Sequence, residues 1–183
     1  MKYSIEKLLT MNGQLNSSEF LFFWGHQPKK DGTIGSGCLS QWWMSAFEFQ
    51  GMHFATAEHW MMYKKAELFK DAQMAEEILQ CESPAKVKKL GRKVQNFDPH
   101  LWNKKKFEFV VEGNRHKFFQ NRELADFLIS TGDKIIVEAS PYDRIWGIGM
   151  SKNHSDIESP DKWRGQNLLG FALMEVRDWL KSN

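Results

Sequence analysis

The stretch Thr56-Ala57-Glu58-His59-Trp60-Met61-Met62-Tyr63-Lys64-Lys65 predicts the helix around which the fold is built. Thr56 is a residue type that caps helix N-termini, and Glu58 falls in the first turn, where the helix dipole favours an anion. We expect this helix to run from Ala57 to about Lys70.

Glu58 and Lys65 are seven residues apart on this helix and therefore share one face. A carboxylate and an amine on such a face can act as acid–base group and nucleophile, because burial lowers the pKa of a lysine. The alternative is a first-turn glutamate with a solvated lysine, since charged helical residues mostly face solvent.

Further helices are predicted towards the C-terminus. Ser83-Pro84 and Asp98-Pro99 each place a capping residue before a proline, which is the pattern of a helix start. The first of these helices is expected to end at Gly91 and the second to run to about Gln120. Two more helices are predicted for residues 122–130 and 167–180.

Three short segments predict strands. The run 20–24 is entirely apolar, 45–51 alternates in part and ends in glycine, and 134–139 holds β-branched residues. Residues 28–37 and 147–166 are polar and contain glycine, which predicts loops. The expected fold class is mainly α (α+β): a single helical domain at 20–183 with a few short β-strands. Residues 1–19 form an N-terminal extension, within which a short helix is expected.

The composition is that of an ordinary globular protein. The chain has 183 residues, 42% hydrophobic and 26% charged, with a net charge of +2; this size suits one domain and the charge excludes a strong overall attraction to nucleic acid. The two cysteines are not closely spaced, which fits a reducing compartment. No apolar run of about 18 residues exists to span a membrane. We therefore expect a cytoplasmic protein.

A second group of candidate functional residues follows the last predicted strand. Asp143 lies just past the strand end, a frequent place for a catalytic or ribose-binding carboxylate; it can also be a turn aspartate that bonds its own backbone. Trp146, before Gly147, can stack on a base or sugar, or pack in the core.

The segment Gly165-Gln166-Asn167 opens the last predicted helix. Free N–H groups at a helix start suit a phosphate, and Asn167 can at the same time be an ordinary cap. The lysines at 86–89 and 104–106 are expected to be solvated, with phosphate contact as the alternative. The six histidines show no metal-ligand spacing, so we expect no metal and no cofactor.

Five motifs, in their order and spacing, resemble the NADAR family, whose bacterial members include the YbiA-like proteins. The resemblance covers residues 20 to 180 approximately and implies a YbiA-like fold for the domain at 20–183. The motifs are Leu39–Trp42, Thr56–Lys65, Ser83–Arg92, Asp143–Gly149 and Gln166–Arg177.

The resemblance implies an N-glycoside hydrolase that cleaves a ribose C1–N bond. Two phosphorylated substrate classes are associated with the family: ADP-ribose attached to guanine, in DNA or RNA, and the early ribosylamino-pyrimidine intermediates of riboflavin synthesis. De-ADP-ribosylation of DNA is therefore one expected activity. A non-catalytic module that binds ADP-ribose or a nucleotide is the alternative.

The resemblance also implies residue roles. Glu58 would be the essential carboxylate, Lys65 a nucleophile that forms a Schiff base or else a binding group, and Asp143 a second acid or a ribose clamp. Substrate-binding roles fall on Trp42, Arg92, Trp146, Gly147 and Asn167, of which Arg92 and Asn167 would hold phosphate. The chain departs from the family at Gln41-Trp42, where relatives often have Asn-Phe, and at 152–163, which looks like an insertion bordering the pocket.

Overall fold

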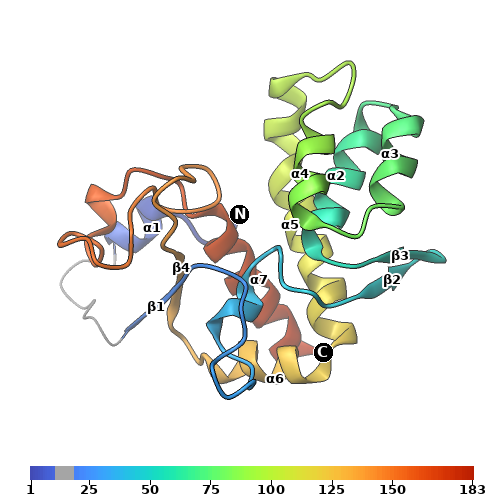
Figure 1. The fold of residues 1–183 in the computed structure, drawn as a ribbon. Coiled ribbons are helices and arrows are strands. Elements are labelled where there is room, and N and C mark those ends of the chain that lie inside the picture. Colours follow the sequence, from blue (N-terminus) through green and yellow to red (C-terminus); the bar gives the residue numbers. More distant parts are fainter. Residues whose placement is uncertain (11–18) are drawn as a thin grey trace. The chain divides into compact units, whose positions relative to one another are not determined.

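The computed structural model describes residues 1–10 and 19–183, which divide into two compact units (Figure 1). Unit 1 comprises Met1–Ser40 and Glu123–Asn183, and unit 2 comprises Gln41–Arg122. The extension predicted at 1–19 contains one short helix, α1 (Ile5–Thr10), while residues 11–18 of it lie outside the described residues.

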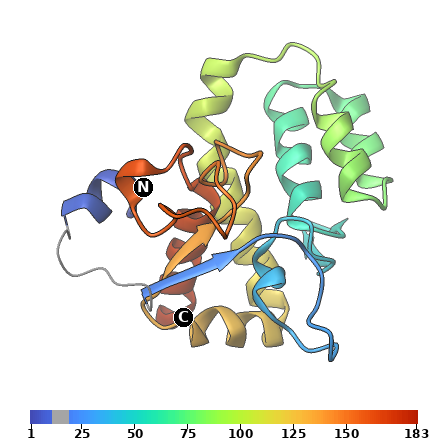
Figure 2. The ribbon, with the colours of Figure 1, turned by 60° about the vertical axis from the view of Figure 1, so that its left-hand side comes forward.

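Unit 1 is built on a parallel pair of strands, β1 (Phe20–Phe23) and β4 (Ile135–Glu138), with Phe20 opposite Ile135. The C-terminal helix α7 (Leu168–Ser182) packs against β4, as Figures 1 and 2 show. A Cβ on Gly170 would lie 2.1 Å from the Ile136 carbonyl oxygen, so only glycine allows α7 to approach the strand this closely.

The rest of unit 1 is helix and long loop. Helix α6 (Arg122–Ser130) precedes β4, and short 3-10 turns occur at η2 (Ser36–Leu39) and η3 (Pro160–Lys162). The predicted loop at 147–166 is indeed mostly irregular, apart from η3. It is anchored by Trp163, which is buried and donates from its indole N–H to the Ile157 carbonyl at 2.7 Å.

Unit 2 combines a hairpin with a group of helices. The hairpin is β2 (Phe47–Phe49) and β3 (Met52–Phe54); the helices are α2 (Ala57–Leu68), α3 (Ala72–Leu79), α4 (Pro84–Gly91) and α5 (Pro99–Gln120). Both turn residues of the hairpin have positive φ, 50° and 76°, the backbone that a two-residue hairpin turn prefers.

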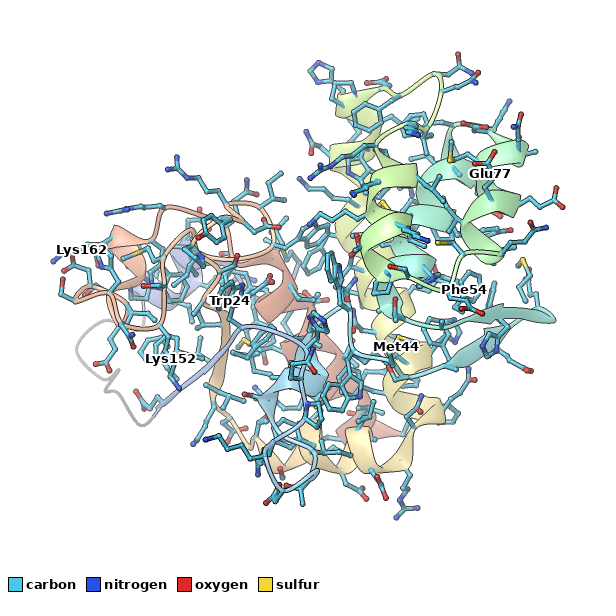
Figure 3. All side chains as sticks on the ribbon, viewed as in Figure 1. Trp24, Met44, Phe54, Glu77, Lys152 and Lys162 are labelled. Carbon is cyan, nitrogen blue, oxygen red and sulfur yellow. The ribbon has the colours of Figure 1, made fainter. Side chains whose placement is uncertain are left out.

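The core of unit 2 is aromatic. Phe47, Phe54 and Trp60 form one buried cluster, and Figure 3 labels Phe54. The Trp60 indole N–H donates to the Phe109 carbonyl at 2.8 Å, which joins α2 to α5. A Cβ on Gly113 of α5 would lie 2.3 Å from Trp60 Cδ1, so this glycine makes room for the ring.

The mainly α (α+β) expectation is confirmed, and so are three of the predicted caps. The side chains of Thr56, Ser83 and Asp98 each accept a hydrogen bond from a backbone N–H in the first turn of the helix that follows. The prediction that α2 continues to Lys70 was wrong by two residues, because Lys70 takes a left-handed φ of 57°. Helix α3, which Asp71 caps, and strand β3 were not predicted.

Candidate active site

Glu58 and Lys65 both lie on α2, as predicted. Glu58 is in the first turn and only 2% exposed, while Lys65 is in the last turn and half-buried. A rise of about 1.5 Å per residue separates their Cα atoms by about 10 Å along the axis, on nearly the same face. The alternative of a solvated lysine does not hold, because Lys65 is half-buried.

The Lys65 amine is held at the end of α4. Its Nζ donates to the Gly91 carbonyl at 2.7 Å and lies 4.0 Å from the centre of the Phe97 ring and 5.7 Å from that of Trp102. The carbonyl and the rings favour the ammonium form, whereas burial disfavours it. The net effect is that burial lowers the pKa of Lys65 below the ordinary lysine value. The amine is therefore both fixed in position and easier to deprotonate.

Gly91 is required by the packing of α4 on α2. A Cβ at this position would lie 1.9 Å from Met62 Sδ. Arg92, predicted to hold phosphate, directly follows Gly91 as the C-terminal cap of α4 and is exposed. Its backbone is thus fixed beside the carbonyl that anchors Lys65, while its guanidinium faces solvent.

His59 has a structural role. It is 2% exposed, with Nε2 at 2.7 Å from the Cys81 carbonyl and Nδ1 at 2.7 Å from the Thr56 hydroxyl. A carbonyl only accepts, so Nε2 carries the proton and Nδ1 accepts from the hydroxyl. Burial also lowers the pKa of His59, which favours this neutral form. The ring locks the start of α2 to the segment before α4.

Trp42 follows the residue that holds Glu58 in place. The backbone N–H of Glu58 donates to the Gln41 carbonyl at 3.0 Å. The Trp42 ring is half-buried, and Lys88 Nζ lies 5.7 Å from its centre. Unit 2 therefore gathers Glu58 and Trp42 at one end of α2, and Lys65 with Arg92 towards the other.

In unit 1, Asp143 adopts the turn arrangement that was the alternative to a catalytic one. Its Oδ1 accepts from the backbone N–H groups of Ile145 and Trp146, at 2.9 and 2.8 Å. These bonds fix the turn and set the position of the half-buried Trp146. The catalytic role of Asp143 stays a prediction.

The start of α7 differs from the expected anion site. The N–H groups of Leu168 and Leu169 donate to the Ile145 and Trp146 carbonyls, at 3.2 and 3.1 Å. Donors that the sequence suggested were free are thus used by the neighbouring loop. The expectation of free N–H groups at this helix start was wrong for these two, because a loop distant in sequence folds over them.

Asn167 is not a side-chain cap of α7 either. It has a left-handed φ of 54° and no side-chain capping bond. Its Oδ1 instead accepts from the Glu138 N–H at 3.0 Å, and its Nδ2 donates to the Ile136 carbonyl at 2.9 Å. This spacing is that of a parallel ladder, so the amide covers the free edge of β4 like a further strand.

Gly147 and Gly165 allow their two backbone segments to pack closely against each other. A Cβ on Gly165 would lie 2.3 Å from the Gly147 carbonyl oxygen, and a Cβ on Gly147 would lie 2.8 Å from the Glu138 carbonyl oxygen. Asn167 N–H also donates to the Gly147 carbonyl at 3.2 Å. Close backbone packing therefore accounts for Gly147.

Sequence reasoning missed a buried amide pair in unit 2. Asn114 of α5 donates from Nδ2 to Gln41 Oε1 at 2.8 Å, and the two side chains are 0% and 6% exposed. One signal was available: Gly113-Asn114 places two poor helix formers inside a 22-residue helix. Gly113 admits Trp60, and Asn114 supplies the amide.

Neither a metal cluster nor a membrane-spanning helix occurs within residues 1–10 and 19–183. In that part of the chain, no group of three or more His, Cys, Asp or Glu side chains is placed to hold a metal ion. Among the same residues, no helix combines the length and apolar character needed to cross a bilayer.

Comparison with known proteins places this geometry in context. The pattern of the NADAR domain matches residues 22–181. N-glycosidase R617 of Acanthamoeba polyphaga mimivirus is 42% identical over 169 residues, which are 90% of this chain and 98% of that protein. N-glycosidase YbiA of Escherichia coli K12 is 32% identical over 130 residues, 71% of this chain and 72% of that protein.

Two further similarities extend the comparison. The riboflavin biosynthesis protein VVA0006 of Vibrio vulnificus is 31% identical over 147 residues, covering 80% of this chain but only 36% of that protein. The NMR structure of E. coli YbiA matches with a TM-score of 0.72 at 24% identity, over 92% of this chain and 88% of that one. At this identity the structural match establishes the fold.

Proposed function

The chain belongs to the NADAR family and, like its relatives named N-glycosidases, is a hydrolase of N-glycosyl bonds; we propose that it cleaves the ribose C1–N bond of ribosylated or ADP-ribosylated bases. Two substrate classes fit the proposal: ADP-ribosyl-guanine in nucleic acid, and the early ribosylamino-pyrimidine intermediates of riboflavin synthesis. The second is favoured by the name of the Vibrio relative.

The observation that carries the proposal is the arrangement of α2. A helix of twelve residues presents a buried carboxylate at its start and an anchored, half-buried amine near its end. Burying charged groups is costly, and a protein that needed only a stable helix would gain nothing from them. The lowered pKa of Lys65 fits a functional site, because perturbed ionisable groups are typical of such sites.

The proposed reaction is a hydrolysis in which the two parts of one water molecule go to the two products. Water supplies the hydroxyl that joins C1, and the nitrogen of the leaving base takes the proton. Glu58, at the positive end of the α2 dipole, would stabilise the positive charge that develops at C1 or transfer the proton to the base. Trp42 would contact the ring, and the exposed Arg92 guanidinium would contact phosphate.

Lys65 admits one further step in this scheme. Its neutral Nζ would attack C1 and displace the base, which takes one of the amine protons. The ring oxygen would then leave C1 with the second proton, which gives a Schiff base with the opened sugar. Water would then hydrolyse the imine and restore the amine. The lowered pKa of Lys65 supports this role, because only the neutral amine is nucleophilic. In the simpler scheme, Lys65 as an ammonium binds the substrate.

A paired hydrolysis assay tests the proposal. One substrate is an oligonucleotide ADP-ribosylated on guanine, the other the phosphoribosylamino-pyrimidine. Glu58→Gln is expected to lower turnover of the true substrate by about 100-fold or more, the usual contribution of an acid–base group. Glu67→Gln, an exposed carboxylate on the same helix, is the matched control and should keep wild-type turnover.

The outcomes separate the alternatives. Release of ADP-ribose from the oligonucleotide assigns base de-ADP-ribosylation, and release of ribose phosphate assigns clearance of the metabolite. Borohydride reduction during turnover should join sugar to Lys65 only if the Schiff base forms. No turnover of either substrate by folded wild type, together with binding of ADP-ribose, would favour the binding module instead.

A further inference from the structure

The buried pair Gln41–Asn114 forms a chain of amide groups that begins at a backbone carbonyl. Asn114 Nδ2 donates to the Val110 carbonyl and to Gln41 Oε1, both at 2.8 Å. The side chains are 0% and 6% exposed, so neither is solvated to any extent. All three residues belong to unit 2.

The orientation of both amides is fixed by this chain. The Val110 carbonyl can only accept, so the group of Asn114 that faces it must be the NH₂. The same NH₂ faces the Gln41 side chain, so the nearer group of Gln41 must be its oxygen. Reversing either amide would set two acceptors or two donors against each other.

In this orientation, one donor and one acceptor of the two amides have no hydrogen-bond partner within the described part of the chain. Among the residues that the structure describes, Gln41 Nε2 and Asn114 Oδ1 are buried and have no hydrogen-bond partner. Buried polar groups in native proteins are nearly always paired, and an exception calls for an explanation such as a ligand or a water molecule. The leftover atoms belong to two amides that one hydrogen bond joins, so a ligand that satisfied both would have to present an acceptor and a donor together.

The pair is connected to the proposed catalytic carboxylate. The Gln41 carbonyl accepts the Glu58 N–H at 3.0 Å, so the backbone of the amide pair and that of the acid are in direct contact. In an N-glycosidase, the group nearest the acid, apart from the sugar, is the leaving base. A base edge is therefore the natural partner for the leftover donor and acceptor.

A lactam edge has the complementary pattern. Its ring carbonyl accepts, matching Gln41 Nε2, and its adjacent ring N–H donates, matching Asn114 Oδ1. Guanine and the 2-amino-4-oxo-pyrimidines share this edge, so one pair of amides serves both of the proposed substrate classes. Such paired amide contacts are specific, because an analogue without the hydrogen-bonding edge leaves buried polar groups unpaired.

We propose that Gln41 and Asn114 bind the lactam edge of the leaving base and so select bases that carry a ring carbonyl next to a ring N–H. This inference rests on the proposed hydrolase function, since that function supplies the base. The assignment extends the site from the reacting carbon to the base and predicts a specificity that Glu58 and Lys65 do not provide.

The test uses two small probes that differ only at this edge. Isocytosine (2-amino-4-pyrimidinone) carries the ring carbonyl and the adjacent N–H, whereas 2-amino-4-methoxypyrimidine has lost both. Binding to the full chain is measured by NMR titration, which needs no turnover. Wild type should bind isocytosine about tenfold or more tightly than 2-amino-4-methoxypyrimidine, because the methoxy probe would leave the buried amides unpaired.

The variants separate recognition from structure. Gln41→Met should weaken isocytosine binding about tenfold and leave the methoxy probe within about twofold, since only the former uses Nε2. Gln41→Glu, which keeps the acceptor for Asn114, should give the same result if the methionine variant does not fold. Gln120→Met is the matched control: it removes an α5 amide that bonds the β2 backbone at Glu48, and both affinities should stay unchanged.

Three results would overturn the assignment. They are absence of a wild-type preference between the probes, equal weakening of both probes by Gln41→Met, and tighter binding of adenine than of isocytosine. The first two would mean that a water molecule or a purely structural bond satisfies the amides. A probe preference without turnover of either substrate would leave recognition of a lactam edge by the two amides standing and would sink the hydrolase proposal. Turnover without the preference would sink the role of the two amides and leave the hydrolase proposal standing.

Discussion

Replacing Asn167 tests whether this residue holds the fold or the substrate. The side chain is 0% exposed and bonds the Glu138 N–H and the Ile136 carbonyl of β4. Asn167→Ala leaves these two backbone groups without the amide. Each buried group left unsatisfied costs about 1–3 kcal/mol, so the two together should destabilise the protein by about 2–6 kcal/mol.

A backbone contribution adds to this loss and can be measured separately. At a φ of 54°, alanine is disfavoured by about 1 kcal/mol while glycine is not. Asn167→Gly therefore isolates the loss of the hydrogen bonds, and the alanine variant should be less stable than the glycine variant by about 1 kcal/mol. The expected order of stability is wild type, then Asn167→Gly, then Asn167→Ala.

Urea unfolding measures these free energies. Circular dichroism and tryptophan fluorescence should give coincident transitions, which justifies a two-state treatment. Asn153→Ala, in an exposed part of the loop, is the matched control and should stay within about 0.5 kcal/mol of wild type. If Asn167→Ala were equally harmless, the edge-covering role would be refuted. If Asn167→Ala instead bound a phosphorylated ligand more weakly at unchanged stability, the result would support the predicted role of Asn167 in holding phosphate.

The remaining predictions concern unit 2. Gly113→Ala should destabilise by about 1–3 kcal/mol, because the clash with Trp60 outweighs the helix gain of about 0.5–1 kcal/mol; a thermal melt that matches the exposed Lys104→Ala would contradict this. Burial lowers the pKa of His59 below 6.5, so the folded state binds fewer protons than the unfolded chain. Its stabilising effect is complete above about pH 6.5 and is lost as the pH falls through the folded value. The melting temperature should therefore fall more steeply with acid in wild type than in His59→Gln, and equal slopes would speak against it.

The helices that the sequence predicted well are those with local start signals. Thr56, Ser83 and Asp98 each bond an N–H within three residues, so the information for the cap is contained in a short segment. Helix α3 and strand β3 were missed because they begin just past a left-handed Lys70 and a two-residue turn, where the predicted helix and strand were taken to end.

In the candidate site, too, the features that depend on local sequence were predicted and those that depend on distant contacts were not. The seven-residue spacing of Glu58 and Lys65 follows from helical periodicity alone, and the order of the motifs along the chain is enough to indicate the NADAR family. The contacts that the site residues make could not be predicted from the sequence. Asp143 was left open between a catalytic group and a turn former, and only the positions of the next two N–H groups showed what its Oδ1 does.

The sequence by itself determined the starts of α2, α4 and α5, the fold class and the family of this protein, because caps and periodicity act over a few neighbouring residues. Tertiary structure alone decided which groups the key side chains meet. Lys65 bonds a carbonyl 26 residues away, Asn167 one that is 31 away, and Asn114 an amide 73 away. Such partners are selected by packing, in which glycines such as Gly91 and Gly170 let backbones approach closely. No local pattern encodes that distance.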